Sequence, residues 1–135
     1  MMTRLNPLSD QVFVSPQVWP GDIPALAERG VVLLINNRPD HEQPDQPTSA
    51  EIESAARDLG LTYVHLPVQG MPSRESVEAL AGALEKAEGP AVAFCRSGMR
   101  SAVLWALAEA ARGGDPDVIR QAAWKAGYDL SGLLP

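Results

Sequence analysis

The side chain of this 135-residue chain best suited to covalent chemistry is that of Cys95, its one cysteine. Cys95 begins the run Cys-Arg-Ser-Gly-Met-Arg-Ser, which lies between a short apolar segment and an apolar helical pattern. The backbone amides of such a turn and the N-terminus of the next helix direct donors to one spot, which suits an anion. Arg100 can add a planar, two-pronged donor set for a tetrahedral oxyanion. The same positive field favours the thiolate, so we predict that Cys95 is a nucleophile.

The other residues of this run are predicted to support the nucleophile. Gly98 permits the positive-φ turn that lets backbone amides face inward. The Ser101 hydroxyl is expected to donate to the thiolate, and Arg96 either touches substrate or lies in solvent. The predicted anion-binding or substrate-binding residues are Arg96, Ser97, Gly98, Met99 and Ser101. The competing interpretation is a buried apolar cysteine, which is the commoner role of an isolated one; the glycine and arginine in the same turn make it the weaker.

Composition excludes several other kinds of site. One cysteine allows neither an intrachain disulfide nor a zinc site built on several thiolates, and two histidines do not suggest a metal centre, so we expect no metal and no cofactor. The formal net charge of −6 argues against a nucleic-acid surface. The longest apolar run, Val31 to Ile35, is too short to cross a bilayer, and the first residues lack an apolar signal segment. A cytoplasmic protein without membrane contacts is therefore expected.

The elements that must position Cys95 alternate between strand and helix patterns. Strands are predicted over residues 11–15, 31–35, 61–68 and 91–94, and helices over 22–29, 48–59, 73–84, 102–111 and 115–127. This order predicts one α/β domain over residues 1–135, with a mostly parallel sheet of four to five strands and helices on both faces. Ligands of such sheets bind beyond the carboxyl ends of the strands, which is where Cys95 is predicted to lie.

A polar, proline-rich stretch from Asn36 to Pro47 is long for a connection in a small domain, so a functional loop is predicted there. Arg38 and Asp40 are its possible auxiliary site residues. They either pair with each other as a brace, which is the favoured interpretation, or act directly, with Asp40 as an acid. Asn36 and Asn37 are expected to bond backbone groups at the end of a strand.

Histidine and aromatic side chains are assigned structural roles before chemical ones. His65 lies inside a predicted strand, so a half-buried position is favoured over a base, and His41 is expected in solvent. Trp105 and Trp124 lie in helical patterns among alanines and leucines, where core packing is the default. Trp19 and Met71 are candidates for lining a substrate entrance.

Residues 94–101, Phe-Cys-Arg-Ser-Gly-Met-Arg-Ser, resemble the catalytic loop of rhodaneses and cysteine-dependent phosphatases. With Leu34–Asp40, the capping box Thr48-Ser-Ala-Glu51 and Tyr63–Val68, they resemble the bacterial family called beta-lactamase-hydrolase-like, phosphatase-like domain, over about residues 10–112. The resemblance implies a tyrosine-phosphatase-like, three-layer fold and an activity variously labelled phosphatase or sulfurtransferase. Some members are fused to a persulfide dioxygenase domain, and any persulfide dioxygenase partner of this chain would be a separate chain.

Two details distinguish the two activities that the resemblance implies. Tyrosine phosphatases place five residues between the cysteine and the arginine, whereas four lie between Cys95 and Arg100, as in the rhodanese pattern Cys-Arg-x-Gly-x-Arg. Dual-specificity phosphatases place an acidic residue after the strand that matches Tyr63–Val68, to protonate the leaving oxygen. Gln69-Gly70 stands there, and Glu75, a few residues on, is predicted in the first turn of a helix.

These details favour a rhodanese-type sulfurtransferase. Cys95 would take a sulfane sulfur from a small-molecule donor as a persulfide and pass it to a thiol acceptor such as glutathione, or to cyanide. The alternatives are a phosphoester hydrolase that works through a phosphocysteine, and a sensor that binds an oxyanion or persulfide without turnover.

Overall fold

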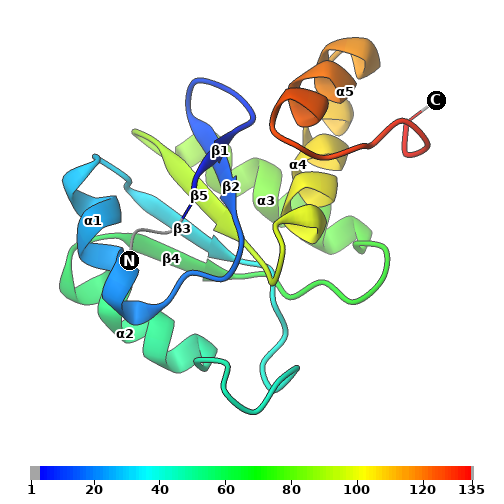
Figure 1. The fold of residues 1–135 in the computed structure, drawn as a ribbon. Helices are drawn as coiled ribbons and strands as arrows, with labels where there is room; N and C mark the ends of the chain where they lie inside the picture. Colours follow the sequence, from blue (N-terminus) through cyan, green and yellow to red (C-terminus); the bar gives the residue numbers. More distant parts are fainter. Residues whose placement is uncertain (1–3, 135) are drawn as a thin grey trace.

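The computed structural model describes residues 4–134 and contains a five-stranded sheet covered by helices (Figure 1). The strands are β1 (Asn6–Pro7), β2 (Val12–Ser15), β3 (Leu33–Asn36), β4 (Thr62–His65) and β5 (Ala91–Phe94). The 3₁₀ turn η1 (Pro20–Asp22) precedes the helices α1 (Ile23–Glu28), α2 (Ser49–Asp58), α3 (Arg74–Lys86), α4 (Met99–Ala111) and α5 (Pro116–Lys125). None of the described helices is long and apolar enough to cross a membrane.

The strand order in the sheet is β1-β2-β5-β3-β4. The pairs β2/β5, β5/β3 and β3/β4 are parallel, and β1 pairs antiparallel with β2 at one edge. All residues of β3 and β5 are buried, as expected for central strands covered on both faces. The predicted fold class is confirmed. The sequence did not predict β1, whose two residues are too few to show a period.

Helices cover both faces of the sheet, and each face has its own apolar core. On one face α1 and α2 pack against β3 and β5, through Ile23, Leu26, Ile52, Leu34 and Phe94. On the other face lie α3 and α4, with α5 packed against α4, and this core includes Leu80, Leu104, Ile119, Ile35 and Ala93. The two cores fix β5 from both sides, so the residue that follows it has a well-defined starting point.

Two tryptophans behave differently from each other. Trp105, on α4, is 4% exposed, as core packing requires. Trp124, on α5, is 68% exposed, so its predicted core position is wrong. The buried face of α5 is made by Ile119 and Ala123, and Trp124 follows Ala123 directly, which turns it away from that face.

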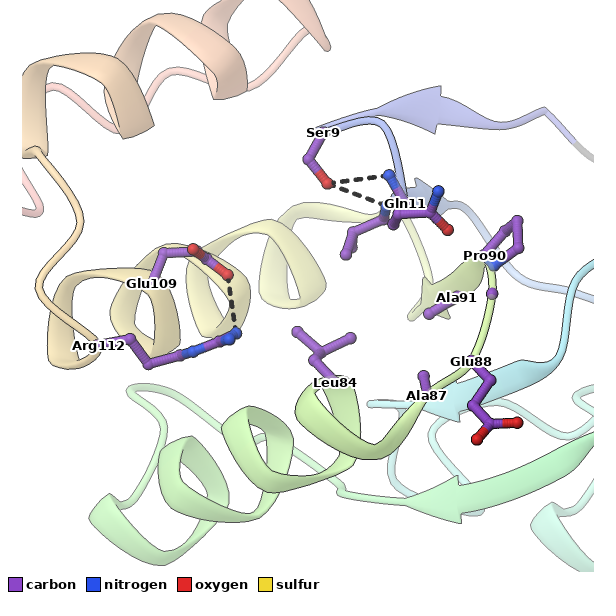
Figure 2. Close-up of a pocket in the computed structure, with 11 residues that line it drawn as sticks. Ser9, Gln11, Leu84, Ala87, Glu88, Pro90, Ala91, Glu109 and Arg112 are labelled. Atoms are coloured by element: carbon purple, nitrogen blue, oxygen red, sulfur yellow. Dashed lines mark hydrogen bonds and ion pairs between the residues drawn. The ribbon is translucent and has the colours of Figure 1, made fainter.

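Because β2, β5, β3 and β4 are parallel, their carboxyl ends meet at one edge of the sheet. The loops that follow these strands therefore gather around Cys95. The hollow drawn in Figure 2, of about 560 Å³, is lined by Gln11, by Ala91 and by the ion pair of Glu109 with Arg112. Ala91 is the first residue of β5, so this hollow lies at the other end of the strand from Cys95.

Candidate active site

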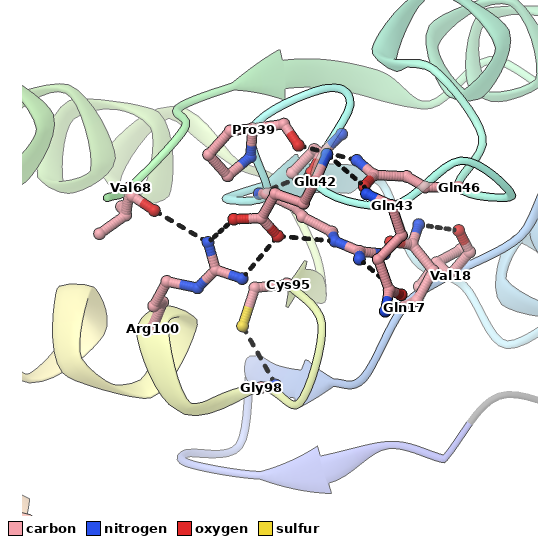
Figure 3. A network of polar contacts seen from close by, with 12 residues as sticks. Gln17, Val18, Pro39, Glu42, Gln43, Gln46, Val68, Cys95, Gly98 and Arg100 are labelled. Atoms are coloured by element: carbon pink, nitrogen blue, oxygen red, sulfur yellow. Dashed lines mark hydrogen bonds and ion pairs between the residues drawn. The ribbon is translucent and has the colours of Figure 1, made fainter. Parts of the chain in front are cut away.

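Cys95 comes directly after β5, and α4 begins at Met99, so a tight turn joins the strand to the helix. The turn closes because Gly98, the N-cap of α4, takes a φ of 98°, in the left-handed region that favours glycine. The Gly98 amide thereby points back and donates a hydrogen bond to Sγ of Cys95 at 3.1 Å (Figure 3). Cys95 is fully buried. The Gly98 N–H is therefore directed at the sulfur, where it can stabilise negative charge that a reaction places there.

Arg100, in the first turn of α4, presents both ends of its guanidinium to the carboxylate of Glu42. Nη1 and Nη2 donate to that carboxylate at 2.7 and 3.0 Å, and Nη1 also donates to the carbonyl oxygen of Val68 at 3.0 Å. The hydrogen bonds with Glu42 raise the pKa of Arg100 above its usual value; burial opposes this, and the neighbouring Cys95 adds to the increase. Arg100 is therefore a fixed cation that faces both Cys95 and Glu42.

Arg38 holds the other side of the same carboxylate. Its side chain is only 4% exposed, and Nε donates to Glu42 at 2.9 Å. Nη1 donates to Gln17 at 2.8 Å and Nη2 to Gln43 at 3.2 Å, so each nitrogen of the buried guanidinium has a partner. A buried arginine is tolerated only when it is paired and hydrogen-bonded in this way. Arg38 therefore acts through Glu42, which in turn fixes Arg100.

Glu42 was not among the predicted site residues, although it lies at the centre of this network. The hydrogen bond from Arg100 is the main cause that lowers its pKa from 4.5 to about 2; burial opposes this, and Arg38 adds to it. Glu42 is thus a carboxylate at physiological pH and has no proton to give. The one sequence signal is its position four residues after Arg38, a spacing at which opposite charges pair.

The predicted brace between Arg38 and Asp40 is wrong. Arg38 pairs with Glu42, and the Asp40 carboxylate accepts a hydrogen bond from the Ser49 amide at 2.7 Å. Ser49 is the first residue of α2, so Asp40 satisfies a free N–H at the helix N-terminus and ties the loop to it.

The expected bond from Ser101 to the thiolate is also replaced by another one. The buried Ser101 hydroxyl donates to Oδ1 of Asn37 at 2.7 Å, which ties α4 to the chain after β3. Asn37 donates to the carbonyl of Leu66 at 2.9 Å, and Asn36 accepts from the Arg38 amide at 2.8 Å, so both asparagines bond backbone groups as predicted. These bonds fix the segments after β3 and β4 and the start of α4 relative to one another.

The remaining predicted residues lie farther out. Arg96, Ser97 and Met99 are exposed, as are His41, Trp19 and Met71. The Arg96 carbonyl accepts from the Gln17 amide at 3.3 Å, which joins the loop to the chain after β2. His65 is half-buried, and its Nε2 bonds the Arg38 carbonyl at 2.9 Å, as the structural interpretation expected.

The fold and the site together define a phosphatase-like α/β domain with a cysteine in the turn from its central strand to a helix. Kinase associated phosphatase, in a structure whose catalytic site cysteine is replaced by serine, has this fold. It superposes with a TM-score of 0.68 at 14% identity, covering 89% of this chain and 80% of that one, so this likeness shows the fold alone.

Closer relatives establish the family. A candidate phosphatase from Neisseria meningitidis is 34% identical, with a TM-score of 0.80 over 92% of this chain and 89% of that one. A "Beta-lactamase hydrolase-like protein" from Agrobacterium fabrum is 35% identical over 107 residues, which are 78% of this chain and 25% of the relative. The chain belongs to the family described as beta-lactamase hydrolase-like protein, phosphatase-like domain, which it matches over residues 4–112. It spans about a quarter of the length of the curated relatives it matches.

Proposed function

We propose that this protein is a cysteine-dependent enzyme in which the Cys95 thiolate attacks its substrate and carries the transferred group. The observation behind this proposal is the environment of the sulfur: the Gly98 amide donates to it at 3.1 Å, and Arg100 lies beside it as a fixed cation. Both features stabilise a thiolate before attack and a negative charge on the bound group afterwards. Cys95 and Arg100 are therefore the proposed catalytic residues.

The choice of reaction depends on whether the leaving group needs a proton. Asp40 is bonded to the Ser49 amide, and Glu42 is held as a carboxylate by two arginines with a pKa of about 2. Glu42 is not suited to protonate a poor leaving group, since an acid works best with a pKa near the operating pH, and Asp40 is engaged by the N-terminus of α2. The site therefore favours a substrate whose leaving group departs as a stable anion.

Sulfane-sulfur transfer meets this requirement and is our first candidate. The Cys95 thiolate attacks the outer sulfur of thiosulfate, the S–S bond of thiosulfate breaks, and sulfite leaves with its electron pair. The product is a Cys95 persulfide, and attack by an acceptor thiolate or cyanide on its terminal sulfur regenerates the Cys95 thiolate. The four-residue spacing between Cys95 and Arg100 supports this candidate. A separate persulfide dioxygenase that uses the product stays a prediction.

Phosphoester hydrolysis is the second candidate, and the comparisons favour it over sulfur transfer. The family is described as phosphatase-like, and the Neisseria meningitidis relative is described as a candidate phosphatase. In this reaction the Cys95 thiolate attacks phosphorus, the P–O bond to the leaving group breaks and that group departs as an anion, and water then hydrolyses the phosphocysteine. Without an acid the reaction is limited to aryl or acyl phosphates, whose leaving groups are good.

Parallel turnover assays separate the candidates. Purified protein and its Cys95→Ser variant are given thiosulfate with cyanide, thiosulfate with glutathione, and an aryl phosphate. Cys95-dependent turnover of the sulfur donor, without phosphate release, supports the first candidate, and the reverse pattern supports the second. Turnover that survives Cys95→Ser contradicts both. Tight binding with no turnover on any substrate indicates the sensor.

A further inference from the structure

Tyr128 is a buried tyrosine that follows α5, beyond the residues matched by the family. Gly127 ends α5 with a φ of 102°, and the Tyr128 amide then donates to the Ala123 carbonyl at 2.8 Å. This glycine-terminated end turns the chain back, because only glycine adopts the left-handed conformation without strain. Tyr128 is thereby packed into the core that holds α4.

The Tyr128 hydroxyl contacts the loop of Cys95 directly. Oη donates to the carbonyl oxygen of Ser97 at 3.2 Å, and Nδ2 of Asn6, in β1, donates to Oη at 3.3 Å. The hydroxyl therefore has both a donor and an acceptor partner, which fixes the direction in which it donates.

The Ser97 carbonyl and the Gly98 amide belong to the same peptide group. The Tyr128 hydroxyl donates to the oxygen of this peptide group at 3.2 Å, and the N–H of the same peptide group donates to Sγ of Cys95 at 3.1 Å. A chain of hydrogen bonds thus runs from Asn6 through Tyr128 and one peptide to the sulfur. Such chains polarise each member, so a donor on the carbonyl strengthens the N–H as a donor.

The close approach also requires glycine at position 98. A Cβ built on Gly98 would lie 2.1 Å from Oη of Tyr128, a distance that no pair of non-bonded atoms tolerates. The loop and the tyrosine are therefore complementary, and the hydroxyl lies against the peptide group whose rotation would turn its N–H away from the sulfur.

We propose that Tyr128 is a positioning residue that holds the Ser97–Gly98 peptide so that its N–H remains on the Cys95 sulfur and stabilises the thiolate. The inference rests on the proposed role of Cys95 as a nucleophile. Arg100, which is paired with Glu42, is a charged group beside Cys95, and the Tyr128 hydroxyl bonds Ser97 and Asn6 rather than either of these two side chains.

The test is the pH titration of Cys95 in wild type and in Tyr128→Phe, followed by the ultraviolet absorbance of the thiolate. The chain has one cysteine, so subtracting the Cys95→Ser spectrum in each background isolates its signal. We expect the midpoint to rise by about half a pH unit in Tyr128→Phe, since part of one hydrogen bond is lost. Trp124→Phe is the matched control, because it changes an exposed aromatic of the same C-terminal part and should leave the midpoint unchanged.

An unchanged midpoint in Tyr128→Phe that melts as the wild type does would overturn the proposal. If Tyr128→Phe does not fold, Asn6→Ala removes the preceding donor of the chain and should raise the midpoint by a smaller amount; no rise there overturns the proposal as well. The titration needs no substrate. It can therefore fail while turnover is observed, or succeed where no tested substrate turns over, which separates this inference from the proposed function.

Discussion

Glu42→Gln tests the network that holds Arg100 and removes one negative charge with little change of shape. The pKa of Glu42 falls from 4.5 to about 2, which sets a ceiling of about 3 kcal/mol on what its charge contributes to stability. The side chain keeps 27% of its surface in solvent, and screening reduces that figure. The buried Arg38 would also lose its counter-charge, and this increases the loss of stability. We expect a loss of about 1–2 kcal/mol in the free energy of unfolding.

The pH dependence of this difference gives the sharper test. The folded state holds the pKa of Glu42 below its unfolded value of 4.5, so its stabilisation is complete above that pH and is lost as the pH falls toward 2. Urea unfolding, followed by tryptophan fluorescence at a series of pH values, measures wild type and variant side by side. The gap between them should close over this window.

Glu53→Gln is the matched control, because Glu53 pairs with Arg57 at 2.8 Å with both side chains more than 40% exposed. An exposed pair of this kind contributes less than about 0.5 kcal/mol. Equal losses of stability in Glu42→Gln and Glu53→Gln, or a difference between Glu42→Gln and wild type that stays constant as the pH falls from 4.5 to 2, would show that the charge of Glu42 does not hold this network.

Three further substitutions probe the loop and its supports. Gly98→Ala should destabilise the protein by about 2 kcal/mol or more and abolish turnover, since it strains a left-handed φ of 98°; a normal melting curve contradicts this. Ser101→Ala should cost about 1–3 kcal/mol in urea unfolding, because Asn37 loses its buried donor, and should leave the Cys95 titration unchanged; a shifted titration would mean that the hydroxyl acts on the sulfur. Asp40→Asn should keep full turnover at every pH, because the Asp40 carboxylate accepts the Ser49 amide and takes no part in proton transfer. If the variant instead loses the fall in rate that an acid causes at high pH, Asp40 is the general acid.

The part of the site that could be predicted from the sequence is local in the chain. Strand β5 was predicted at its observed bounds; the cysteine and glycine that follow it lie in the turn, and the arginine lies in the first turn of α4. A short apolar run followed by a glycine-containing turn and a helix has few alternative structures, so the placement of Cys95 at a strand end follows directly.

The residues that were missed or misassigned depend on contacts between distant segments. Glu42 meets Arg100 across 58 positions of the chain, and Tyr128 meets Ser97 across 31. No period or spacing in a sequence reports such pairs, because loop conformation decides them. For the same reason Ser101 could be placed on a helix but not matched with Asn37 as its partner.

Trp124 shows a different limit. An aromatic residue among alanines on a short amphipathic helix fits either face in the sequence pattern. The structure selects the face by packing Ile119 and Ala123 inward, which leaves Trp124 outside.

The central claim is that Cys95 carries the transferred group, and intact mass spectrometry after a single turnover tests it most directly. The protein is mixed with thiosulfate in the absence of an acceptor and quenched in acid, and its intact mass is measured. A parallel sample receives an aryl phosphate in place of thiosulfate. Wild type should gain the mass of one sulfur atom from thiosulfate, cyanide should remove it, and Cys95→Ser should gain nothing. A gain of phosphate alone would mean that the same cysteine carries a phosphoryl group rather than sulfur, as the phosphatase reaction requires. No gain from either substrate, or an equal gain in Cys95→Ser, would contradict the account.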